Sequence, residues 1–409
     1  MPSELSLSAT QETNQKTHIA SPTERAVARL LTKLTIGSVN VTLPNGRVLS
    51  AKGEQPGPSA HLTLHRMRML RRLAWGGDIG FAESYIDGDC DSPDLASLVE
   101  LALRNESAGQ LPLDAGPIRR ALNRAIHLLR ANTRRGSRRN IAAHYDLGND
   151  FYRLWLDDSM TYSAAMFASP DQPLRDAQTA KYRHLADMLG LKPGMEVLEI
   201  GCGWGGFAEI AARDYGCRVT ALTLSQEQKT YAEARMARAG LSDRVEILLR
   251  DYRDEAGCYD AIASIEMFEA VGERYWPVYF DSLDRCLKPG AKAALQVITI
   301  EHDRFERYRA EADFIQRYVF PGGMLPSPAI FRDQAEAKGF RMERDVFFGL
   351  DYARTLALWN QAFQKHWPEI EAQGYDRRFK RLWEYYLAYC EGGFRTGSID
   401  VGQFLLARG

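Results

Sequence analysis

The sequence predicts an α/β protein with a doubly wound, mostly parallel, Rossmann-like sheet, preceded by a smaller N-terminal α+β domain. From Leu191 onward, apolar segments of strand length alternate with helical segments, which is typical of parallel strands joined by crossover helices. One of these strands, in "VLEIGCGWGG", runs directly into a glycine-rich turn. The 409 residues, 45% of them hydrophobic, are enough for two domains with cores of their own.

The N-terminal part begins with a polar tail. Residues 1–22 are rich in Ser, Thr, Gln and Asn, and this composition predicts disorder. Residues 23–115 are expected to form the small domain. Within them "VNVTLPNGRVLSA" is typical of a strand, an Asn-Gly turn and a second strand, and helical patterns follow at 62–77 and 94–103.

A basic segment at 116–140 is predicted to be a linker helix between the domains. Its Arg-rich part, 118–139, contains eight arginines and no acid. Apolar residues recur there at helical spacing: Ile118, Leu122, Ile126 and Leu129. One apolar face among cationic residues predicts peripheral binding to an anionic membrane. A solvated linker helix packed on a neighbouring domain remains the alternative. Nucleic acid is not an expected partner, because no aromatic residues are interleaved for stacking.

Composition excludes several other classes of protein. The formal net charge is −1, so no global attraction to polyanions exists. The six cysteines lack the spacing of a zinc site or a disulfide framework, and no metal is expected. The polar N-terminus and the lack of a long apolar run predict a cytoplasmic protein without a membrane span, associated with the inner face of the membrane.

The large domain is predicted at 141–409. Five strands are expected in order at 195–200, 217–224, 245–251, 259–267 and 291–300. Helices are expected after the glycine turn, at 225–240 and at 274–290. In such a sheet, ligands bind at the carboxyl ends of the strands.

The glycine turn itself admits two interpretations. Gly201, Gly203 and Gly206 satisfy the GxGxxG pattern of a dinucleotide site, and an NAD oxidoreductase is therefore one alternative. That site also needs an acid at the end of the second strand, where 222–224 read Leu-Thr-Leu. Glu199 together with the glycines up to Gly205 instead matches the acidic-x-Gly-x-Gly-x-Gly loop of class I methyltransferases. A tight turn that serves packing alone is the remaining alternative.

Further motifs carry a resemblance to a known family. They are "RNIAAHYDLGNDFYRLWLDDSMTYSAAMF", "VLEIGCGWGGFAEIAA", "TLSQEQ", "SIEMFEAVGERYWPVYF", "FIQRYVFPGGMLPS" and "YYLAYCEGGFR". In this order, over about 137–400, they resemble the cyclopropane fatty-acyl-phospholipid and mycolic acid synthase family. The N-terminal domain resembles, less distinctly, the lipid-binding domain of the bacterial phospholipid enzymes. The resemblance implies methyl transfer from S-adenosylmethionine to a double bond in an acyl chain of a bilayer phospholipid.

The resemblance also implies the residues that bind the cofactor. They are Tyr162, Ser163, Glu199, Ile200, Gly201, Cys202, Gly203, Trp204, Gly205, Thr223, Leu224, Gln228, Tyr252 and Arg253. Thr223 and Gln228 stand where the family usually has the acid that binds the ribose.

The chemistry places its own demands on the site. An isolated alkene is a poor nucleophile, so the site must exclude water and align the double bond with the methyl group. Methyl transfer leaves a carbocation, from which a base must remove a proton. Aromatic ring faces tolerate such a cation. The candidates are Phe167, Phe268, Tyr275, Trp276, Tyr318 and Phe320.

The resemblance implies that this base is a bound bicarbonate, as it is in the family. The catalytic candidates carried over are Glu269, Tyr352, Gln296, Ala164, Ile298 and Cys390. Ala164 replaces a cysteine and Gln296 replaces a histidine of the family pattern, and Ala270 replaces a histidine beside the site. A glutamine can donate a hydrogen bond to an anion, but it cannot carry a proton as histidine can.

The sequence therefore predicts a methyltransferase acting on unsaturated acyl chains, most simply a cyclopropane synthase. Loss of a different proton would give a methyl-branched or methylene chain instead. An inactive lipid-binding protein is the alternative from another class. The sequence leaves a homodimer open.

Overall fold

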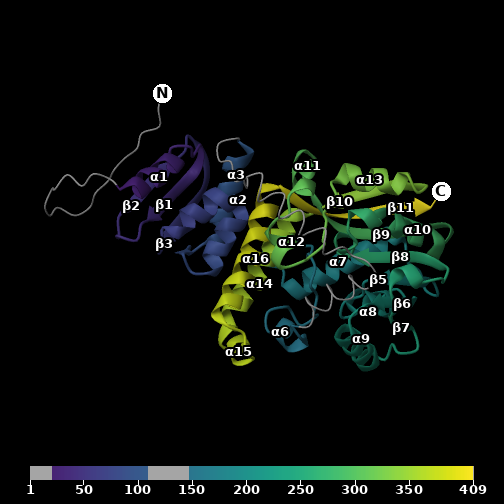
Figure 1. The fold of residues 1–409 in the computed structure, drawn as a ribbon. Coiled ribbons are helices and arrows are strands. Elements are labelled where there is room, and N and C mark those ends of the chain that lie inside the picture. The colour runs from purple at the N-terminus through teal and green to yellow at the C-terminus, as the bar shows by residue number, and fades with distance from the viewer. Residues whose placement is uncertain (1–20, 109–146, 409) are drawn as a thin grey trace. The chain divides into compact units, whose positions relative to one another are not determined.

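The computed structural model describes residues 21–108 and 147–408, which belong to two compact units (Figure 1). The first unit is drawn from Met1–Leu122 and Tyr375–Thr396, and the second from Asn123–Gly374 and Gly397–Gly409. A helix late in the chain thus groups with the N-terminal unit, whereas the sequence assigned all of 141–409 to one domain. The basic segment 116–140 and the first 20 residues of the expected tail lie outside the described residues, so both remain predictions.

The N-terminal unit contains a four-stranded sheet in the order β2-β1-β3-β4. Its strands are β1 (Ile36–Thr42), β2 (Val48–Lys52), β3 (Gln55–Leu64) and β4 (Cys90–Asp91). The predicted hairpin is confirmed, because β1 and β2 pair antiparallel around a turn at Gly46, whose φ is 80°. The predicted helix at 62–77 starts later than expected. Residues 62–64 complete β3, which pairs with β1 in parallel.

The described residues of this unit also form four helices: α1 (Pro22–Leu31), α2 (Arg68–Ile86), α3 (Leu95–Ser107) and α16 (Arg377–Thr396). A capping box of Ser21 and Glu24 starts α1. Helix α16 packs on α2 and α3. The approach to α3 is close, since a Cβ added to Gly392 would lie 2.6 Å from the Val99 side chain. This packing explains why α16 belongs to the N-terminal unit.

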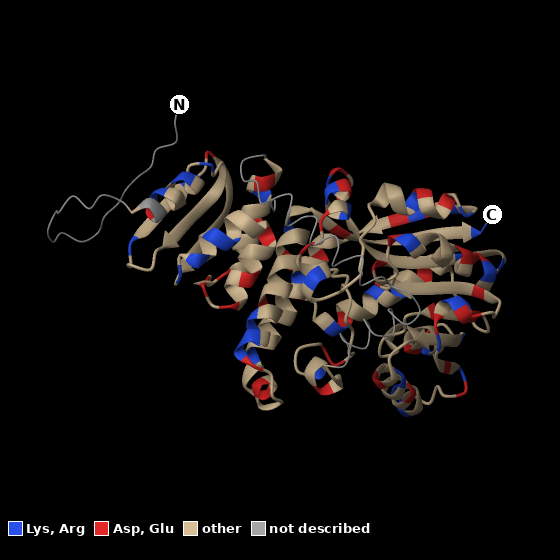
Figure 2. Ribbon diagram, in the orientation of Figure 1, with Lys and Arg blue, Asp and Glu red and all other residues tan. Residues whose placement is uncertain are grey.

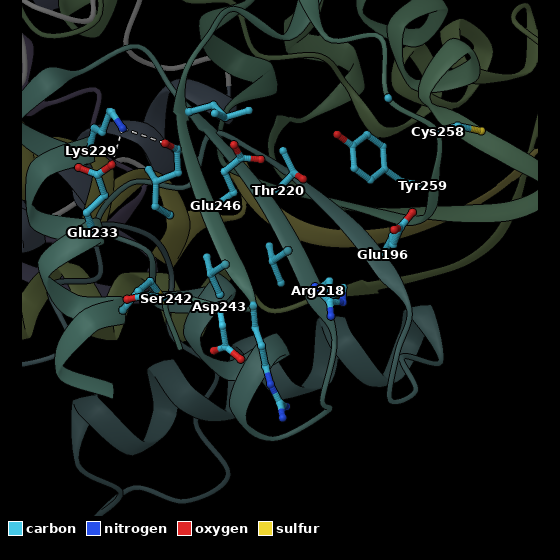
Figure 3. Close-up of a pocket in the computed structure, with 17 residues that line it drawn as sticks. Glu196, Arg218, Thr220, Lys229, Glu233, Ser242, Asp243, Glu246, Cys258 and Tyr259 are labelled. Atoms are coloured by element: carbon cyan, nitrogen blue, oxygen red, sulfur yellow. Dashed lines mark hydrogen bonds and ion pairs between the residues drawn. The ribbon is translucent and has the colours of Figure 1, made fainter. Parts of the chain in front are cut away.

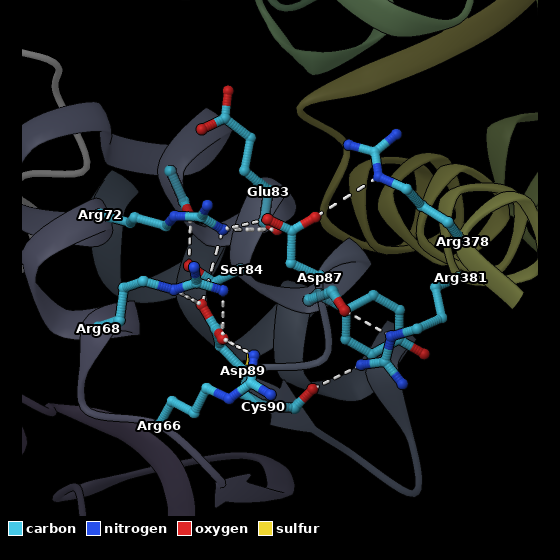
Figure 4. Close-up of polar contacts among 12 residues, drawn as sticks. Arg66, Arg68, Arg72, Glu83, Ser84, Asp87, Asp89, Cys90, Arg378 and Arg381 are labelled. Atoms are coloured by element: carbon cyan, nitrogen blue, oxygen red, sulfur yellow. Dashed lines mark hydrogen bonds and ion pairs between the residues drawn. The ribbon is translucent and has the colours of Figure 1, made fainter.

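A buried carboxylate follows α2 in the same unit (Figure 4). Asp89 is fully buried, and its oxygens receive the guanidinium of Arg68 at 2.8 Å, with Arg66 at 3.5 Å and Arg72 at 3.6 Å. Arg381 of α16 donates to the carbonyl oxygens of residues 85 and 90 beside it. These contacts tie α16 to the loop that follows α2.

The second unit contains a seven-stranded sheet in the order β10-β11-β9-β8-β5-β6-β7. Its strands are β5 (Glu196–Ile200), β6 (Arg218–Thr223), β7 (Val245–Leu249), β8 (Tyr259–Ile265), β9 (Leu287–Ile300), β10 (Phe340–Phe347) and β11 (Ile399–Arg408). Strands β5 to β9 pair in parallel, so the doubly wound, mostly parallel sheet is confirmed. The sequence did not predict β10 and β11, which add an antiparallel edge and pair Gln403 with Gln296.

Helices cover both faces of this sheet. On one face the core contains residues of α7 (Leu174–Leu189), α8 (Gly206–Arg213) and α9 (Gln226–Ala239). On the other it contains residues of α10 (Trp276–Cys286) and α13 (Pro328–Glu336). The remaining helices are α6 (Asn149–Arg153), α11 (His302–Ala310), α12 (Phe314–Tyr318), α14 (Gly349–Lys365) and α15 (Trp367–Ala372). Charged residues lie mainly on the helices and at the ends of strands, and the parallel strands are largely uncharged (Figure 2).

Among residues 21–108 and 147–408, no helix is long and apolar enough to cross a membrane. In the same part of the chain, no group of His, Cys, Asp and Glu side chains is arranged to hold a metal ion.

Candidate functional site

The glycine turn joins the end of β5 to the start of α8. Gly201, Gly203 and Gly205 have φ angles of 84°, 51° and 83°, a left-handed conformation that glycine adopts at least cost. A Cβ placed on Gly203 would meet no atom within 4 Å. The backbone of this turn is therefore open to a ligand.

Glu199 lies in β5 directly before the turn. Its side chain is buried, and its Oε2 has no hydrogen-bond partner among the described residues. Burial raises the pKa of this carboxyl to about 8, although a backbone N–H and the charges of Arg235 and Lys181 oppose the shift. An orphaned buried polar atom beside an open glycine turn fits a site that binds a polar ligand.

The predicted adenosine residues lie at the carboxyl end of β6. Thr223 and Gln228 are both buried, and the Thr223 hydroxyl donates to Gln228 Oε1 at 2.9 Å. Ser225 caps α9 by accepting from the Gln228 backbone N–H. Leu224 lies between them and is partly exposed. A hydrogen-bonded pair of neutral side chains thus occupies the position where the family usually has the acid that binds the ribose.

Tyr252 and Arg253 follow β7, as predicted. Arg253 is held by two hydrogen bonds to Asp251, at 2.6 and 2.8 Å, so its charge is matched by a buried carboxylate. The Tyr252 ring packs edge-on against Tyr279 with centroids 5.3 Å apart. The sequence did not single out Asp251, although an acid directly after a buried strand was a signal for it.

An aromatic cluster surrounds the predicted Tyr162. Ring centroids lie 5.1 Å apart for Tyr152 and Trp204, 5.5 Å for Tyr152 and Tyr162, 5.5 Å for Trp155 and Tyr162, and 5.4 Å for Tyr162 and Trp359. Tyr352 joins the cluster, with its ring 6.1 Å from that of Trp359. None of the aromatic residues that the sequence analysis expected to face a cation belongs to this cluster. Phe268 and Trp276 stack on each other in the core beneath the sheet.

The predicted catalytic residues meet at the carboxyl ends of β8 and β9, around a residue that the sequence analysis missed. Glu266 Oε1 accepts the Ala164 backbone N–H at 2.8 Å and Gln296 Nε2 at 2.7 Å. Its Oε2 accepts the Tyr352 hydroxyl at 2.7 Å. All three donors are neutral. Burial raises the pKa of Glu266, and the charge of Lys181 together with these hydrogen bonds opposes that shift.

Glu269 lies one turn further along the chain. Its Oε1 accepts the Ile298 backbone N–H, and its Oε2 is buried without a hydrogen-bond partner among the described residues. Burial, followed by the nearby charge of Glu266, raises the pKa of Glu269 to about 8. Two adjacent carboxylates cannot both ionise cheaply. The additional donors and the Lys181 charge favour the ionised form of Glu266, whereas Glu269 holds a proton below its pKa of about 8.

Two further groups support this cluster. Gln403 of β11 donates to Gln296 Oε1 at 3.0 Å, and accepts from His184 Nδ1 at 2.6 Å. The Gln296 oxygen is therefore engaged, which turns its amino group toward Glu266. Lys181 is fully buried and donates to the Ser163 hydroxyl at 2.6 Å. Its pKa falls to about 7 because of burial, while the charge of Glu266 opposes the fall.

The structure thus brings together five predicted residues: Ala164, Gln296 and Tyr352 around Glu266, and Ile298 with Glu269. Cys390 lies on α16 in the N-terminal unit, and its role stays a prediction. The sequence analysis missed Glu266, Lys181 and Gln403. Glu266 could have been found, because an acid ends the buried strand sequence "YDAIASIE".

A surface cavity of about 800 Å³ lies elsewhere in this unit (Figure 3). It is lined by Glu196, Arg218 and Val245, which begin β5, β6 and β7. It therefore opens at the amino ends of these strands. The carboxylate cluster and the glycine turn lie at the carboxyl ends, where doubly wound sheets bind their ligands.

The fold and this arrangement of glycine turn, neutral adenosine pair and carboxylates define a class I S-adenosylmethionine-dependent methyltransferase. Residues 132–404 match the family described as mycolic acid cyclopropane synthetase, and the chain belongs to that family. Its cofactor is S-adenosylmethionine. The open turn at Gly203 and the orphaned oxygen of Glu199 fit this group.

Two curated relatives match most of the chain. The tuberculostearic acid methyltransferase UfaA1 of Mycobacterium tuberculosis is 40% identical over 379 residues, covering 88% of this chain and 86% of the relative. The cyclopropane-fatty-acyl-phospholipid synthase of Escherichia coli is 38% identical over 345 residues, covering 83% and 86%. The crystal structure of mycolic acid cyclopropane synthase CmaA1 complexed with SAH and CTAB is similar at a TM-score of 0.62 and 34% identity. It covers 66% of this chain and 98% of that one.

Proposed function

We propose that the protein transfers a methyl group to a carbon–carbon double bond in an acyl chain of a membrane phospholipid. One observation carries the proposal: a carboxylate held by neutral donors lies at the carboxyl ends of β8 and β9, with Tyr352 joining it to an aromatic cluster. Such a site suits a reaction that passes through a cation and ends by losing a proton. The names of the two relatives support a fatty acyl substrate.

The residues of the chain divide this chemistry between them. S-adenosylmethionine supplies an electrophilic methyl group when it is bound. The open turn at Gly203 would hold it by backbone contacts, and the Thr223–Gln228 pair would flank its adenosine. The rings around Tyr162 exclude water from the reacting carbons and present their faces to positive charge. The carboxylate cluster receives the proton that must leave.

Two products are consistent with proton loss. If the proton leaves the new methyl group directly, a cyclopropane ring closes, as the name of the Escherichia coli relative suggests. If a hydride first shifts between neighbouring carbons, the chain keeps a methylene branch. The replacements at Ala164 and Gln296, together with the name of the tuberculostearic acid relative, favour this second candidate. A saturated methyl branch would need a further reductant.

Lipid mass spectrometry tests this function. Purified protein is given phospholipid vesicles with unsaturated chains and S-adenosylmethionine labelled in its methyl group, and the released fatty acids are analysed by gas chromatography with mass spectrometry. We expect labelled chains that gain one carbon, with the ring and methylene isomers separated by retention time. Gly203→Val is the control, because a β-branched residue at φ 51° is strained and fills the open turn. Its S-adenosylhomocysteine binding should be lost. Absence of label from every chain with the intact protein would refute the proposal.

The membrane association expected of the Arg-rich segment 118–139 is part of the same proposal. Each basic residue near an anionic surface contributes about 1 kcal/mol. Replacing four arginines by glutamine should reduce sedimentation with anionic vesicles and leave S-adenosylhomocysteine affinity unchanged: Arg119, Arg120, Arg124 and Arg130. Unchanged sedimentation would leave only the linker interpretation. A cytoplasmic protein attached to the inner face of the membrane would find its substrate there.

A further inference from the structure

Glu266 has an unusual backbone for a glutamate. Its φ is 49°, and among the described residues only Met160, at 52°, is another non-glycine residue with positive φ. Met160 lies four residues before Ala164, in the segment that provides a donor to Glu266. Left-handed backbone in non-glycine residues costs free energy and is retained mainly where it serves a site. One strained residue therefore carries this carboxylate, and the other lies four positions before one of its donors.

The donors around Glu266 are the groups that the resemblance assigned to a bound bicarbonate. The Ala164 N–H, the Gln296 amide and the Tyr352 hydroxyl all donate to the Glu266 carboxylate instead. A separate anion in the same place would lack these donors. It would also lie beside the Glu266 carboxylate, whose negative charge would repel it. The residues present do not fit a bicarbonate.

We propose that the Glu266 carboxylate is the proton acceptor of the reaction, built into the chain in place of a bound anion. This inference rests on the proposed function. The alkene π pair forms the bond to the incoming methyl carbon, and the pair of the broken S–C bond stays on sulfur. Glu266 then accepts a proton from the resulting cation, and the C–H pair closes the ring or forms the double bond. Glu266 becomes a carboxylic acid and returns its proton to water before the next turnover.

The geometry leaves Glu266 able to accept that proton. A carboxylate offers about four lone-pair sites, and the three donors occupy three of them. The residue is also not fully buried, in contrast to Asp89. The donors are neutral, and the carboxylate therefore stays basic enough to take a proton.

Two variants separate a built-in acceptor from a structural carboxylate. In Glu266→Gln the shape remains and the base is lost, so methyl-transfer turnover should fall by roughly 10²–10⁴-fold. In Glu266→Gly the left-handed backbone is relaxed, so the protein should fold, and the three donors are set free. Glu343→Gln on β10, an exposed residue of an ion pair with Lys292, is the matched control and should keep full turnover.

Bicarbonate is the probe. Turnover is measured in buffer freed of carbon dioxide, with and without added bicarbonate, and binding of ¹³C-labelled bicarbonate is followed by NMR in the presence of S-adenosylhomocysteine. We expect wild-type turnover to be unaffected and its bicarbonate binding to be absent. Glu266→Gly should bind bicarbonate and regain part of its turnover when bicarbonate is added.

Three results would overturn the inference: wild-type turnover that depends on bicarbonate, bicarbonate binding by the wild type, or full turnover by Glu266→Gln. The NMR arm does not need a lipid substrate. If no lipid is methylated, the proposed function fails, whereas the difference in bicarbonate binding between wild type and Glu266→Gly still decides whether the Glu266 side chain occupies the anion position. S-adenosylhomocysteine affinity, expected to be equal in all variants, shows that each is folded.

Discussion

Asp89 is fully buried in the N-terminal unit, Glu266 is partly buried in the second unit, and the two carboxylates have opposite surroundings. Asp89 is surrounded by Arg68, Arg66 and Arg72 (Figure 4). Burial alone would raise its pKa, but the hydrogen bond and charge of Arg68, with the other arginines, bring it below its ordinary value. Glu266 has only neutral donors, and its pKa is raised.

The difference shows what decides the role of a buried carboxylate. Guanidinium partners stabilise the ionised form, so Asp89 stays an ion and serves to hold elements together. Neutral donors orient a carboxylate but stabilise its ionised form less than guanidinium groups do. Glu266 can therefore be protonated and deprotonated during turnover. The contrast predicts that Asp89 matters for folding and Glu266 for chemistry. Four experiments test this contrast.

The largest effect is expected from Glu266→Gln on turnover, and the stability of the same variant separates a chemical role from a structural one. The glutamine oxygen can still accept from Ala164 and Gln296, and its amino group can donate to the Tyr352 hydroxyl, which rotates to accept. The melting temperature should therefore stay level or rise while turnover falls by roughly 10²–10⁴-fold. Calorimetric melting beside the turnover assay checks this. A variant that melts much earlier would make Glu266 a structural residue like Asp89.

Asp89→Asn should have the reverse effect. It leaves three guanidinium groups facing a neutral amide, and we expect a loss of about 2–3 kcal/mol in the free energy of unfolding. The value lies below that of a fully buried pair because the arginine side chains are 26–63% exposed. Chemical denaturation followed by circular dichroism measures it. The folded variant should keep its turnover and its pH profile, and a changed profile would contradict the assignment of Asp89.

Tyr352→Phe should shift the pH dependence of turnover. The hydroxyl donates to the ionised form of Glu266, so removing it raises the pKa of that carboxyl further. Turnover needs the ionised form and is lost as the pH falls through this pKa. The acid limb of the pH–rate profile should therefore move up by about one pH unit. An unmoved limb, with turnover lowered equally at every pH, would indicate that Tyr352 acts on something other than Glu266.

The smallest effect is expected from Glu269→Gln at neutral pH. Since Glu269 carries a proton below a pKa of about 8, a neutral amide resembles it, and turnover should fall less than tenfold. Stability carries a second signature. The folded wild type keeps a proton that the unfolded chain releases near pH 4.5, so this group's contribution falls as the pH rises from 4.5 to about 8. The melting-temperature difference, variant minus wild type, should rise over that window. A flat difference would mean that Glu269 is ionised throughout.

Much of the fold could be predicted from local pattern. The parallel strands are apolar runs between helices, and the hairpin at Gly46 has a strong turn signal. The segments of β10 and β11 were missed, because β11 pairs with β9, about a hundred positions earlier in the chain, and β10, among the described strands, pairs only with β11. The helix at 62–77 was started too early, because the last residues of β3 are apolar and suit either structure. The packing of α16 on α2 and α3 has no local signal at all.

The site could be predicted as a set of residues but not as an arrangement. The resemblance to the family identified Ala164, Gln296 and Tyr352, and the structure shows them donating to one carboxylate. The sequence analysis chose Glu269 and passed over Glu266, three residues earlier. Nothing in the spacing decides between them. The left-handed backbone at Glu266, which aims one of the two toward the donors, exists only in the folded chain.

Gln403 has a consequence for the order of events in synthesis. It holds Gln296 in place and contacts the Lys181 carbonyl, partners 107 and 222 positions earlier in the chain. On the ribosome, the glycine turn and the parallel strands emerge well before β11. A growing chain can thus form its cofactor turn while Gln296 still lacks its partner. We therefore expect methyl transfer to require β11 in the sheet, because Gln403 of that strand holds the Gln296 amide.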